Sequence, residues 1–270
     1  MTLPRAISSL TNDRVKFIRS LEMRKVRRET GLFVAEGVSI LVTAREMGFV
    51  PEILVYQAGS VTSDVAQGLI DGALQAGSEC LEVTAAVLEK LAAKDNPQTM
   101  LGVFRQRWAN LPDVGALGAD AVWLVLEEIR DPGNLGTILR TVDAFGVTGV
   151  ILVGSCVDPY SREAIRATMG SIFAVPLVRI TREALLDFAS EWPGDRIGTH
   201  LDATSDVRHA KFAFPVLLLM GSEGPGLTAE LAAICTKLVK IPMAGKLDSL
   251  NLSIAAAITL FEVRRAHLKL

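Results

Sequence analysis

The first hundred residues alternate between two spacings of apolar side chains. Four apolar residues can share one face of a helix, and basic residues fill much of the rest: Val15, Ile18, Leu21 and Val26. This spacing predicts a helix over residues 13–29. Further helices are predicted over residues 37–47, 61–76 and 85–93, and strands over residues 32–35, 52–56, 80–83 and 100–105. Because strands and helices alternate, we expect this half to form a compact α/β unit.

The second half carries strands without polar interruptions. Three such runs cover residues 121–126, 150–153 and 216–220, and a shorter run covers residues 237–241. A strand that is apolar at every position is typical of a parallel sheet covered on both faces. A long helix is predicted over residues 254–269. The predicted fold class is therefore α/β, with a mostly parallel sheet in this half.

A short irregular segment separates the two halves. Residues 109–118 contain one proline and two glycines and show no apolar period. We therefore expect a first domain over residues 1–108, a linker over residues 109–118 and a second domain over residues 119–270.

Composition favours a folded protein without a membrane span. Hydrophobic residues make up 50% of the 270 positions and charged residues 21%, which excludes a disordered chain. No apolar run approaches the roughly 18 residues that a membrane helix needs, and residues 1–30 lack the apolar core of a signal peptide. The three cysteines share no metal-ligand spacing. We expect reduced, mostly buried thiols, no bound metal and a cytoplasmic location.

Charge is distributed unevenly, although the net charge is only −2. Residues 1–30 hold eight Lys and Arg side chains against three Asp and Glu side chains. A compact basic segment of this kind is typical of a surface that binds nucleic-acid phosphates. The alternative is a helix whose charges are merely solvated. The candidate nucleic-acid-binding residues are Arg14, Arg24, Lys25, Arg27 and Arg28.

Three strand–loop–helix junctions in the second half carry unusual residues, and ligands of parallel sheets bind outside the carboxyl ends of the strands. The first junction covers residues 127–140. Pro132 and Gly133 turn the chain, and Asn134 can cap the following helix. Arg140 lies roughly 9 Å further along that helix, so its guanidinium can reach a phosphate placed over the helix start. The alternative is an ordinary capped helix with a surface arginine.

The second junction covers residues 220–227 and directly follows a predicted buried strand. It contains three glycines within six residues, which predicts a tight bend of the backbone. Folding does not require a carboxylate in such a bend, so Glu223 is a candidate to orient an arginine or to bind a substrate. The segment has neither the GxGxxG spacing of a dinucleotide site nor the lysine of a P-loop. The alternative is a plain glycine-rich turn.

The third junction covers residues 241–253 and leads into the long helix predicted at the end of the chain. Ser249, Asn251 and Ser253 are all residue types that cap helices. One helix needs one cap, so the surplus indicates contact with a ligand.

Taken together, the three junctions resemble the three signature motifs of the SpoU (TrmH-like) family of ribose 2′-O-methyltransferases, within the SPOUT class. The matching segments are NLGTILR in the first junction, GSEGPG in the second, and IPMAG with SLNLS in the third. Residues 158–171 also look like a block of this family, and the resemblance covers about residues 121–265. Residues 7–12 and 31–37 are similar to the L30e-like substrate-binding domain that is often fused to such enzymes.

This resemblance implies a fold, a methyl donor and a set of site residues. The sheet would thread its C-terminal segment into a trefoil knot, and two copies would form a homodimer with sites near the interface. The methyl donor would be S-adenosylmethionine, and the residues implied for binding it are Gly221, Ile241, Leu250, Met220, Met243 and Gly245. The residues implied at the reaction are Arg140, Asn134, Glu223, Ser249 and Asn251.

The resemblance also implies that the substrate is a ribose 2′-hydroxyl of RNA, bound in part by the basic residues of positions 14–28. Ribosomal RNA is favoured over tRNA, because the L30e-like domain is common in the ribosomal branch. Arg140 would clamp a phosphate and stabilise the developing oxyanion, since arginine stays protonated in proteins. Three alternatives stay open: a tRNA 2′-O-methyltransferase, a methyltransferase of RNA bases, and a non-catalytic RNA-binding protein on the same scaffold.

Overall fold

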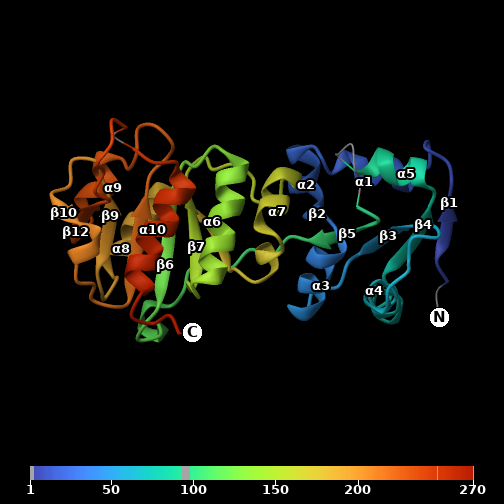
Figure 1. Ribbon diagram of the computed structural model, residues 1–270, viewed down its shortest axis with the longest axis horizontal. Coiled ribbons are helices and arrows are strands. Elements are labelled where there is room, and N and C mark those ends of the chain that lie inside the picture. The colour runs from blue at the N-terminus through green and yellow to red at the C-terminus, as the bar shows by residue number, and fades with distance from the viewer. Residues whose placement is uncertain (1–2, 93–97, 248, 270) are drawn as a thin grey trace. The chain divides into compact units, whose positions relative to one another are not determined.

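A computed structural model describes residues 3–92, 98–247 and 249–269. The chain divides into two compact units (Figure 1). The first unit contains Met1–Gln106 and Asp158–Ala174, and the second contains Arg107–Val157 and Val175–Leu270. The first unit therefore takes up a segment that the sequence prediction assigned to residues 119–270. The division into functional domains at residues 109–118 stays a prediction.

The first unit is built on a five-stranded mixed sheet. Its strand order is β1 (Arg5–Ile7), β4 (Glu79–Val83), β3 (Ile53–Gln57), β5 (Met100–Arg105) and β2 (Leu32–Glu36). Strands β1, β4 and β3 run parallel, whereas β5 is antiparallel to both of its neighbours. Its helices are α1 (Asp13–Ser20), α2 (Arg24–Thr30), α3 (Val38–Glu46), α4 (Asp64–Gln75), α5 (Ala85–Leu91) and α7 (Arg162–Thr168). The predicted end of α5 at Ala93 lies outside the described residues.

The single helix predicted over residues 13–29 is wrong, because the chain turns between α1 and α2. Arg27 on α2 explains how the turn is held. Its Nη1 donates to the carbonyl oxygens of Leu21 and Glu22, at 2.8 and 2.7 Å, which lie in the turn itself. Its Nε and Nη2 contact Oδ2 of Asp158 at 2.9 and 2.8 Å. The side chain of Arg27 is buried and all three of its nitrogens have partners, so it is a structural residue and leaves the set of candidate nucleic-acid contacts.

The second unit is built on a seven-stranded sheet in which every pairing is parallel, as predicted. Its strand order is β10 (Ser205–Asp206), β12 (Lys237–Lys240), β9 (Arg196–Thr199), β11 (Val216–Met220), β6 (Val122–Glu127), β7 (Gly149–Val153) and β8 (Leu177–Ile180). Its helices are α6 (Pro132–Ala144), α8 (Arg182–Ser190), α9 (Ala229–Ala233) and α10 (Leu252–Arg264). The α/β fold class is confirmed, and the trefoil knot stays a prediction.

Both faces of this parallel sheet are buried. On one face, alternate residues of β6, β7 and β11 pack against Leu185 and Phe188 of α8 and Leu231 of α9. The intervening residues point to the opposite face, as alternation along a strand requires, and Leu124 and Leu218 there are fully buried. Helices α6 and α10 lie side by side in the same unit (Figure 1). None of the helices in the described ranges is long and apolar enough to cross a membrane.

The segment predicted as a linker is packed onto the second unit. The amide of Ala109 donates to the carbonyl oxygen of Leu177 in β8 at 2.8 Å. Leu111, Val114 and Leu117 pack against the apolar cluster beneath α8 and α9. Residues 109–118 are therefore part of the second unit, because their apolar side chains pack against its core.

Candidate active site

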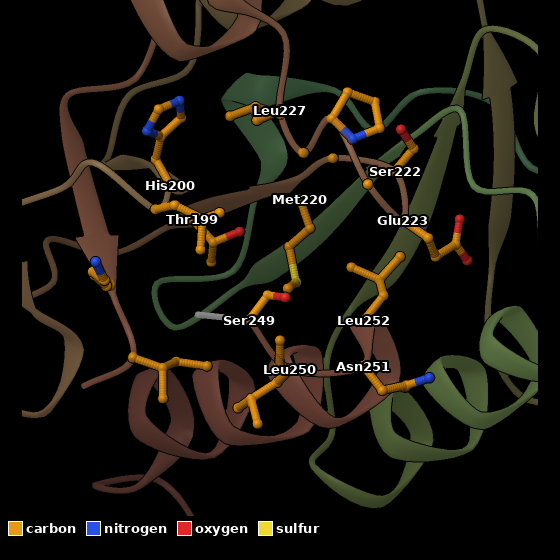
Figure 2. A pocket seen from close by; sticks show the side chains of 18 of the residues that line it. Thr199, His200, Met220, Ser222, Glu223, Leu227, Ser249, Leu250, Asn251 and Leu252 are labelled. Carbon is orange, nitrogen blue, oxygen red and sulfur yellow. The ribbon is translucent and has the colours of Figure 1, made fainter. Parts of the chain in front are cut away.

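The three junctions meet at the carboxyl edge of the second unit's sheet. They follow β6, β11 and β12, and the order of strands is β12, β9, β11, β6, so all three loops emerge on the same edge. A cavity of about 610 Å³ at this edge is lined by the second and third junctions and by the end of β9 (Figure 2). The predicted site residues that line it are Met220, Gly221, Glu223, Ile241, Met243, Ser249, Leu250 and Asn251. In Figure 2 the side chain of Met220 points toward Ser249.

The second junction bends tightly, as predicted, and Gly221 shows why it must. A Cβ at Gly221 would lie 1.9 Å from the carbonyl carbon of Gly226 and 2.0 Å from the amide nitrogen of Leu227. The amide of Gly226 donates to the carbonyl oxygen of Ser222 at 3.1 Å and closes the loop. Only glycine fits where the backbone returns this closely, so the loop presents main-chain groups to the cavity.

The Glu223 carboxylate ties the second junction to the first. It accepts hydrogen bonds from the backbone amides of Arg130 and Asp131, at 3.1 and 3.4 Å, and from Asn134 Nδ2 at 3.0 Å. Burial raises the pKa of the Glu223 carboxyl, but the bonds from Asn134 and the two amides outweigh burial and hold the pKa below its usual value. Glu223 is therefore ionised at neutral pH and acts as an acceptor for the neighbouring loop.

Asn251 ties the third junction to the same network. Its Oδ1 accepts from the backbone amide of Ser253 at 2.9 Å and thereby caps α10, one of the three caps proposed from the sequence. Its Nδ2 donates to Oδ1 of Asn134 at 2.9 Å. A continuous chain of hydrogen bonds thus runs from Glu223 through Asn134 to Asn251 and joins all three junctions.

Asn134 does not cap α6, contrary to the sequence prediction. The cap is Asp131, whose Oδ1 accepts from the amide of Asn134 at 2.6 Å, and Pro132 takes the first helical position. An Asp-Pro pair at a helix start was the signal that the prediction missed. The side chain of Asn134 is free of capping and serves the bridge between the other two junctions instead.

Three predicted site residues do not line the cavity: Asn134, which reaches it only through its bonds to Glu223 and Asn251, and Arg140 and Gly245. Arg140 is exposed on α6, and the structure records no hydrogen bond or ion pair for it among the described residues. Gly245 is exposed in the third junction and does not line the cavity. The single chain therefore does not bring Arg140 to the cavity wall, and its part in the reaction stays a proposal.

The end of β9 forms a cavity wall that sequence reasoning missed. Thr199, His200, Leu201 and Asp202 line the cavity there. The amide of Asp202 donates to Nδ1 of His200 at 3.2 Å and closes a short turn. Strand β9 has only four residues and includes Gly198, so no apolar run announced it. Only the position of β9 in the sheet, between β12 and β11, shows that it lines the cavity, and the sequence does not predict this position.

The candidate basic residues of the first unit differ in their ion pairs and in their exposure to solvent. Arg14 pairs with Glu79 through two contacts, at 3.1 and 3.0 Å. Lys25 lies 3.9 Å from Glu29, and Arg24 and Arg28 are exposed on the same helix, α2. Arg14 is exposed as well, so four of the five candidate residues lie at the surface and Arg27 alone is buried.

The cysteines are consistent with inert thiols. Burial raises the pKa of Cys80 to about 11 and that of Cys235 to about 12, and it also raises the pKa of Cys156. Thiols of this kind do not ionise at neutral pH. Within residues 3–92, 98–247 and 249–269, no group of three or more His, Cys, Asp or Glu side chains is placed to hold a metal ion.

Two protein families match the chain. Residues 121–261 match the SpoU rRNA methylase family, and residues 12–102 match the MRM3-like substrate-binding domain. The first match contains all three junctions, and the second contains the basic helices α1 and α2. These matches confirm the predicted family, and the role of the first half in binding RNA stays a proposal.

Individual relatives match over nearly the whole chain. An uncharacterised tRNA/rRNA methyltransferase from Synechocystis is 34% identical, over 96% of this chain and 93% of its own length. The 23S rRNA (guanosine(2553)-2′-O)-methyltransferase RlmP from Bacillus subtilis is 29% identical, over 96% of this chain and 98% of its own. The crystal structure of an AdoMet-bound rRNA methyltransferase from Sinorhizobium meliloti is 40% identical, with a TM-score of 0.89, and the alignment covers 98% of this chain and 99% of that one.

Proposed function

Because the chain belongs to the SpoU rRNA methylase family, we propose that it transfers the methyl group of S-adenosylmethionine to a ribose 2′-hydroxyl of ribosomal RNA. The observation that carries this proposal is the bond chain Glu223–Asn134–Asn251, which joins the three family motifs beside one cavity. The Bacillus subtilis relative methylates a ribose of 23S rRNA by its name, and the Sinorhizobium meliloti relative was crystallised with AdoMet. Both support the proposal. A cytoplasmic location stays part of it.

The cavity fits S-adenosylmethionine, which supplies an electrophilic methyl group when bound. Met220 and Leu250 give it apolar walls, and the bend at Gly221 offers main-chain groups of the kind that hold an adenine ring. Ile241 and Met243 extend the apolar lining from the third junction. We assign cofactor binding to these five residues, and Gly245 stays outside this set because it does not reach the cavity.

Replacing Gly221 by alanine is expected to weaken cofactor binding by at least about tenfold, because the added Cβ overlaps the backbone of Gly226 and forces the loop to open. Isothermal titration calorimetry with S-adenosylmethionine measures the change. The matched control is Gly118→Ala, where a Cβ meets only Asp120 Oδ1, at 3.9 Å. Equal affinities for Gly221→Ala and the control would contradict the assigned role of the bend.

The residues of the chain would promote transfer by holding the RNA ribose in line with the donor. Alignment of two reactants contributes up to roughly 7–11 kcal/mol in ideal cases. Glu223, Asn134 and Asn251 fix the three loops in one geometry, and Ser249 lies at the cavity beside them. Arg140, with no partner of its own among the described residues, is available for a phosphate and for the charge that develops on the ribose oxygen.

We further propose that the chain acts as a homodimer. Five large apolar side chains of the third junction and α10 are exposed: Met243, Leu247, Leu250, Ile254 and Phe261. Exposed apolar side chains gathered on one segment of the chain are typical of an interaction site, and homo-oligomers bury such side chains against a copy of themselves. Two of these residues, Met243 and Leu250, also line the cavity, so a partner on this surface would lie next to the site.

The first unit would bind the RNA substrate through the exposed cations of α2. The triple variant Arg24→Ala, Lys25→Ala, Arg28→Ala is expected to lose roughly tenfold or more in affinity for RNA and to show a flatter dependence of affinity on salt. Filter binding over a series of salt concentrations measures both. The control replaces Lys16, a basic residue of α1 that pairs with Asp13 at 3.1 Å. Unchanged affinity and salt slope in the triple variant would support the alternative of merely solvated charges.

The whole proposal is tested by incubating the protein with labelled S-adenosylmethionine and, in parallel, with ribosomal RNA and with tRNA that lack the modification. We expect label in the RNA at a position that resists alkaline hydrolysis, because a 2′-O-methyl group blocks cleavage of the adjacent phosphodiester. Label at a position that remains sensitive to alkali would indicate base methylation. Transfer to tRNA alone would overturn the ribosomal substrate, and RNA binding without transfer would indicate the non-catalytic alternative.

A further inference from the structure

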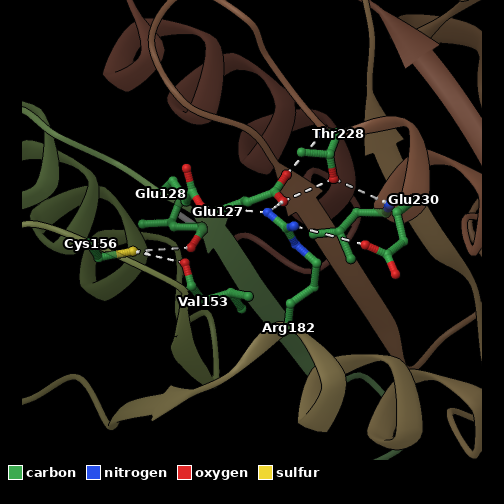
Figure 3. Close-up of polar contacts among 9 residues, drawn as sticks. Glu127, Glu128, Val153, Cys156, Arg182, Thr228 and Glu230 are labelled. Carbon is green, nitrogen blue, oxygen red and sulfur yellow. Dashed lines mark hydrogen bonds and ion pairs between the residues drawn. The ribbon is translucent and has the colours of Figure 1, made fainter.

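Glu127, the last residue of β6, forms a cluster of polar contacts with Thr228 and Arg182 (Figure 3). The Glu127 side chain is only 2% exposed. Its Oε2 accepts from the backbone amide of Thr228 at 2.9 Å, and its Oε1 accepts from the Thr228 hydroxyl at 2.9 Å. Arg182 Nη2 donates to the same Oε1 at 2.9 Å. We call Glu127, Thr228 and Arg182 the β6 clamp. None of the three lines the cavity.

Thr228 is the first residue after the second junction. It follows Leu227 directly, and its hydroxyl also caps α9 by accepting from the amide of Leu231 at 3.4 Å. The entry of the junction is fixed by the pairing of Met220 in β11 with Leu126 in β6. The exit has no strand to hold it, so the two bonds to Glu127 anchor it instead.

Arg182 supplies the positive charge that a buried carboxylate needs. It is the first residue of α8, and its guanidinium extends to Glu127, to Glu128 at 3.5 Å and to Glu230 at 3.9 Å. An ionised carboxylate buried without a cation is strongly unfavourable. The ion pair therefore allows Glu127 to remain a charged acceptor, which binds two donors of Thr228 more strongly than a neutral group would.

The first and second junctions each contribute one carboxylate that accepts hydrogen bonds from the other junction or from the residue that follows it. Glu223, in the second junction, accepts from the amides of Arg130 and Asp131 in the first. Glu127, at the start of the first junction, accepts from Thr228, directly after the second. Glu223 lines the cavity, whereas neither Glu127 nor Thr228 does. Loosening the Glu127 contact would therefore let the exit of the second junction move away from the cavity.

We propose that the β6 clamp positions the second junction for cofactor binding, so that Glu127, Thr228 and Arg182 are positioning residues of the methyl-transfer site. This inference rests on the proposed function. The clamp acts on the loop that carries Gly221 and Glu223 without touching the cofactor, the RNA or the reacting atoms.

The test compares kinetic constants of three variants with the wild type. Glu127→Gln keeps the shape of the side chain but replaces one acceptor oxygen by a donor. Thr228→Val removes the hydroxyl, and Thr228→Ser restores it. For Glu127→Gln and Thr228→Val we expect KM for S-adenosylmethionine to rise by about tenfold, while kcat at saturating cofactor stays within about twofold, since lost ground-state binding raises KM alone. Thr228→Ser should return KM to the wild-type range.

Glu230→Gln is the matched control, because Glu230 contacts the same guanidinium but makes no bond to the second junction. We expect its KM to equal that of the wild type. Thermal unfolding of each variant without cofactor separates positioning from folding. Wild-type KM in both Glu127→Gln and Thr228→Val would overturn the proposal. So would a Thr228→Val variant in which unfolding temperature and kcat fall while KM does not change. A wild-type protein that binds no S-adenosylmethionine would overturn the proposed function itself, and the clamp with it.

Discussion

Replacing Arg140 by alanine is expected to reduce methyl transfer by at least roughly 10²–10³-fold, the range seen when a donor to a developing oxyanion is removed. Cofactor binding should remain at the wild-type level, because Arg140 does not line the cavity and its side chain makes no hydrogen bond or ion pair in the described chain. Incorporation of labelled methyl groups into RNA measures transfer, and calorimetry measures cofactor binding. We expect methyl transfer to fall while the affinity for S-adenosylmethionine does not change.

The control for this variant is Arg265→Ala. Arg265 is also an exposed arginine of the second unit, but it pairs with Glu262 at 3.2 Å on α10, and its loss should leave transfer unchanged. Arg140→Lys should not restore activity, since an ammonium cannot bind a phosphate through two parallel bonds as a guanidinium does. Near-normal methylation by Arg140→Ala would remove Arg140 from the proposed mechanism.

Replacing Glu223 by alanine is expected to impair cofactor binding and transfer together. Three donors then lose their acceptor: the amides of Arg130 and Asp131 and the side chain of Asn134. Hydrogen bonds to a charged acceptor contribute roughly 1.5–3 kcal/mol each, so we expect a loss of about 10²-fold or more in kcat/KM. Unlike Arg140→Ala, this variant should bind S-adenosylmethionine more weakly, because the loops that frame the cavity come apart.

Glu223→Gln provides the graded comparison. The amide keeps one acceptor oxygen, so we expect its activity to lie between the wild type and Glu223→Ala. Kinetics with varied cofactor and varied RNA measure both constants for each variant. An alanine variant with wild-type kcat/KM would show that the bond chain from Glu223 to Asn251 is not what holds the site together.

The strands β6, β7 and β11 of the second unit could be predicted because each carries a run of consecutive apolar residues. Residues 121–126 and 216–220 read as buried strands, and they are β6 and β11, paired in parallel at the centre of the sheet. The edge strand β10 has only two residues, and the four residues of β9 carry one large apolar side chain, Ile197, so neither shows an apolar run. The wall that β9 contributes to the cavity was therefore beyond the sequence.

The roles of single polar residues were harder to predict than the loops that carry them. Asn134 and Asp131 are both good caps, and only the structure shows that Asp131 caps α6 while Asn134 bridges two junctions. Arg27 reads as one cation among five, yet it is buried against Asp158, which lies 131 positions away. A partner this far away in the chain cannot be recognised from the residues around Arg27. Such partners decide whether a charged side chain is used in the fold or can bind RNA.

The segment Asp158–Ala174 limits how independent the two halves of this protein can be. Tyr160 and Phe173 stack on Phe33 in the first unit, with ring centroids 4.8 and 5.8 Å apart, and Asp158 neutralises the buried Arg27. The backbone therefore passes between the units three times rather than once. Two self-sufficient domains joined end to end would need a single passage. Exchange of the first half between relatives, whether by recombination or by protein engineering, must carry this inserted segment with it to preserve the core.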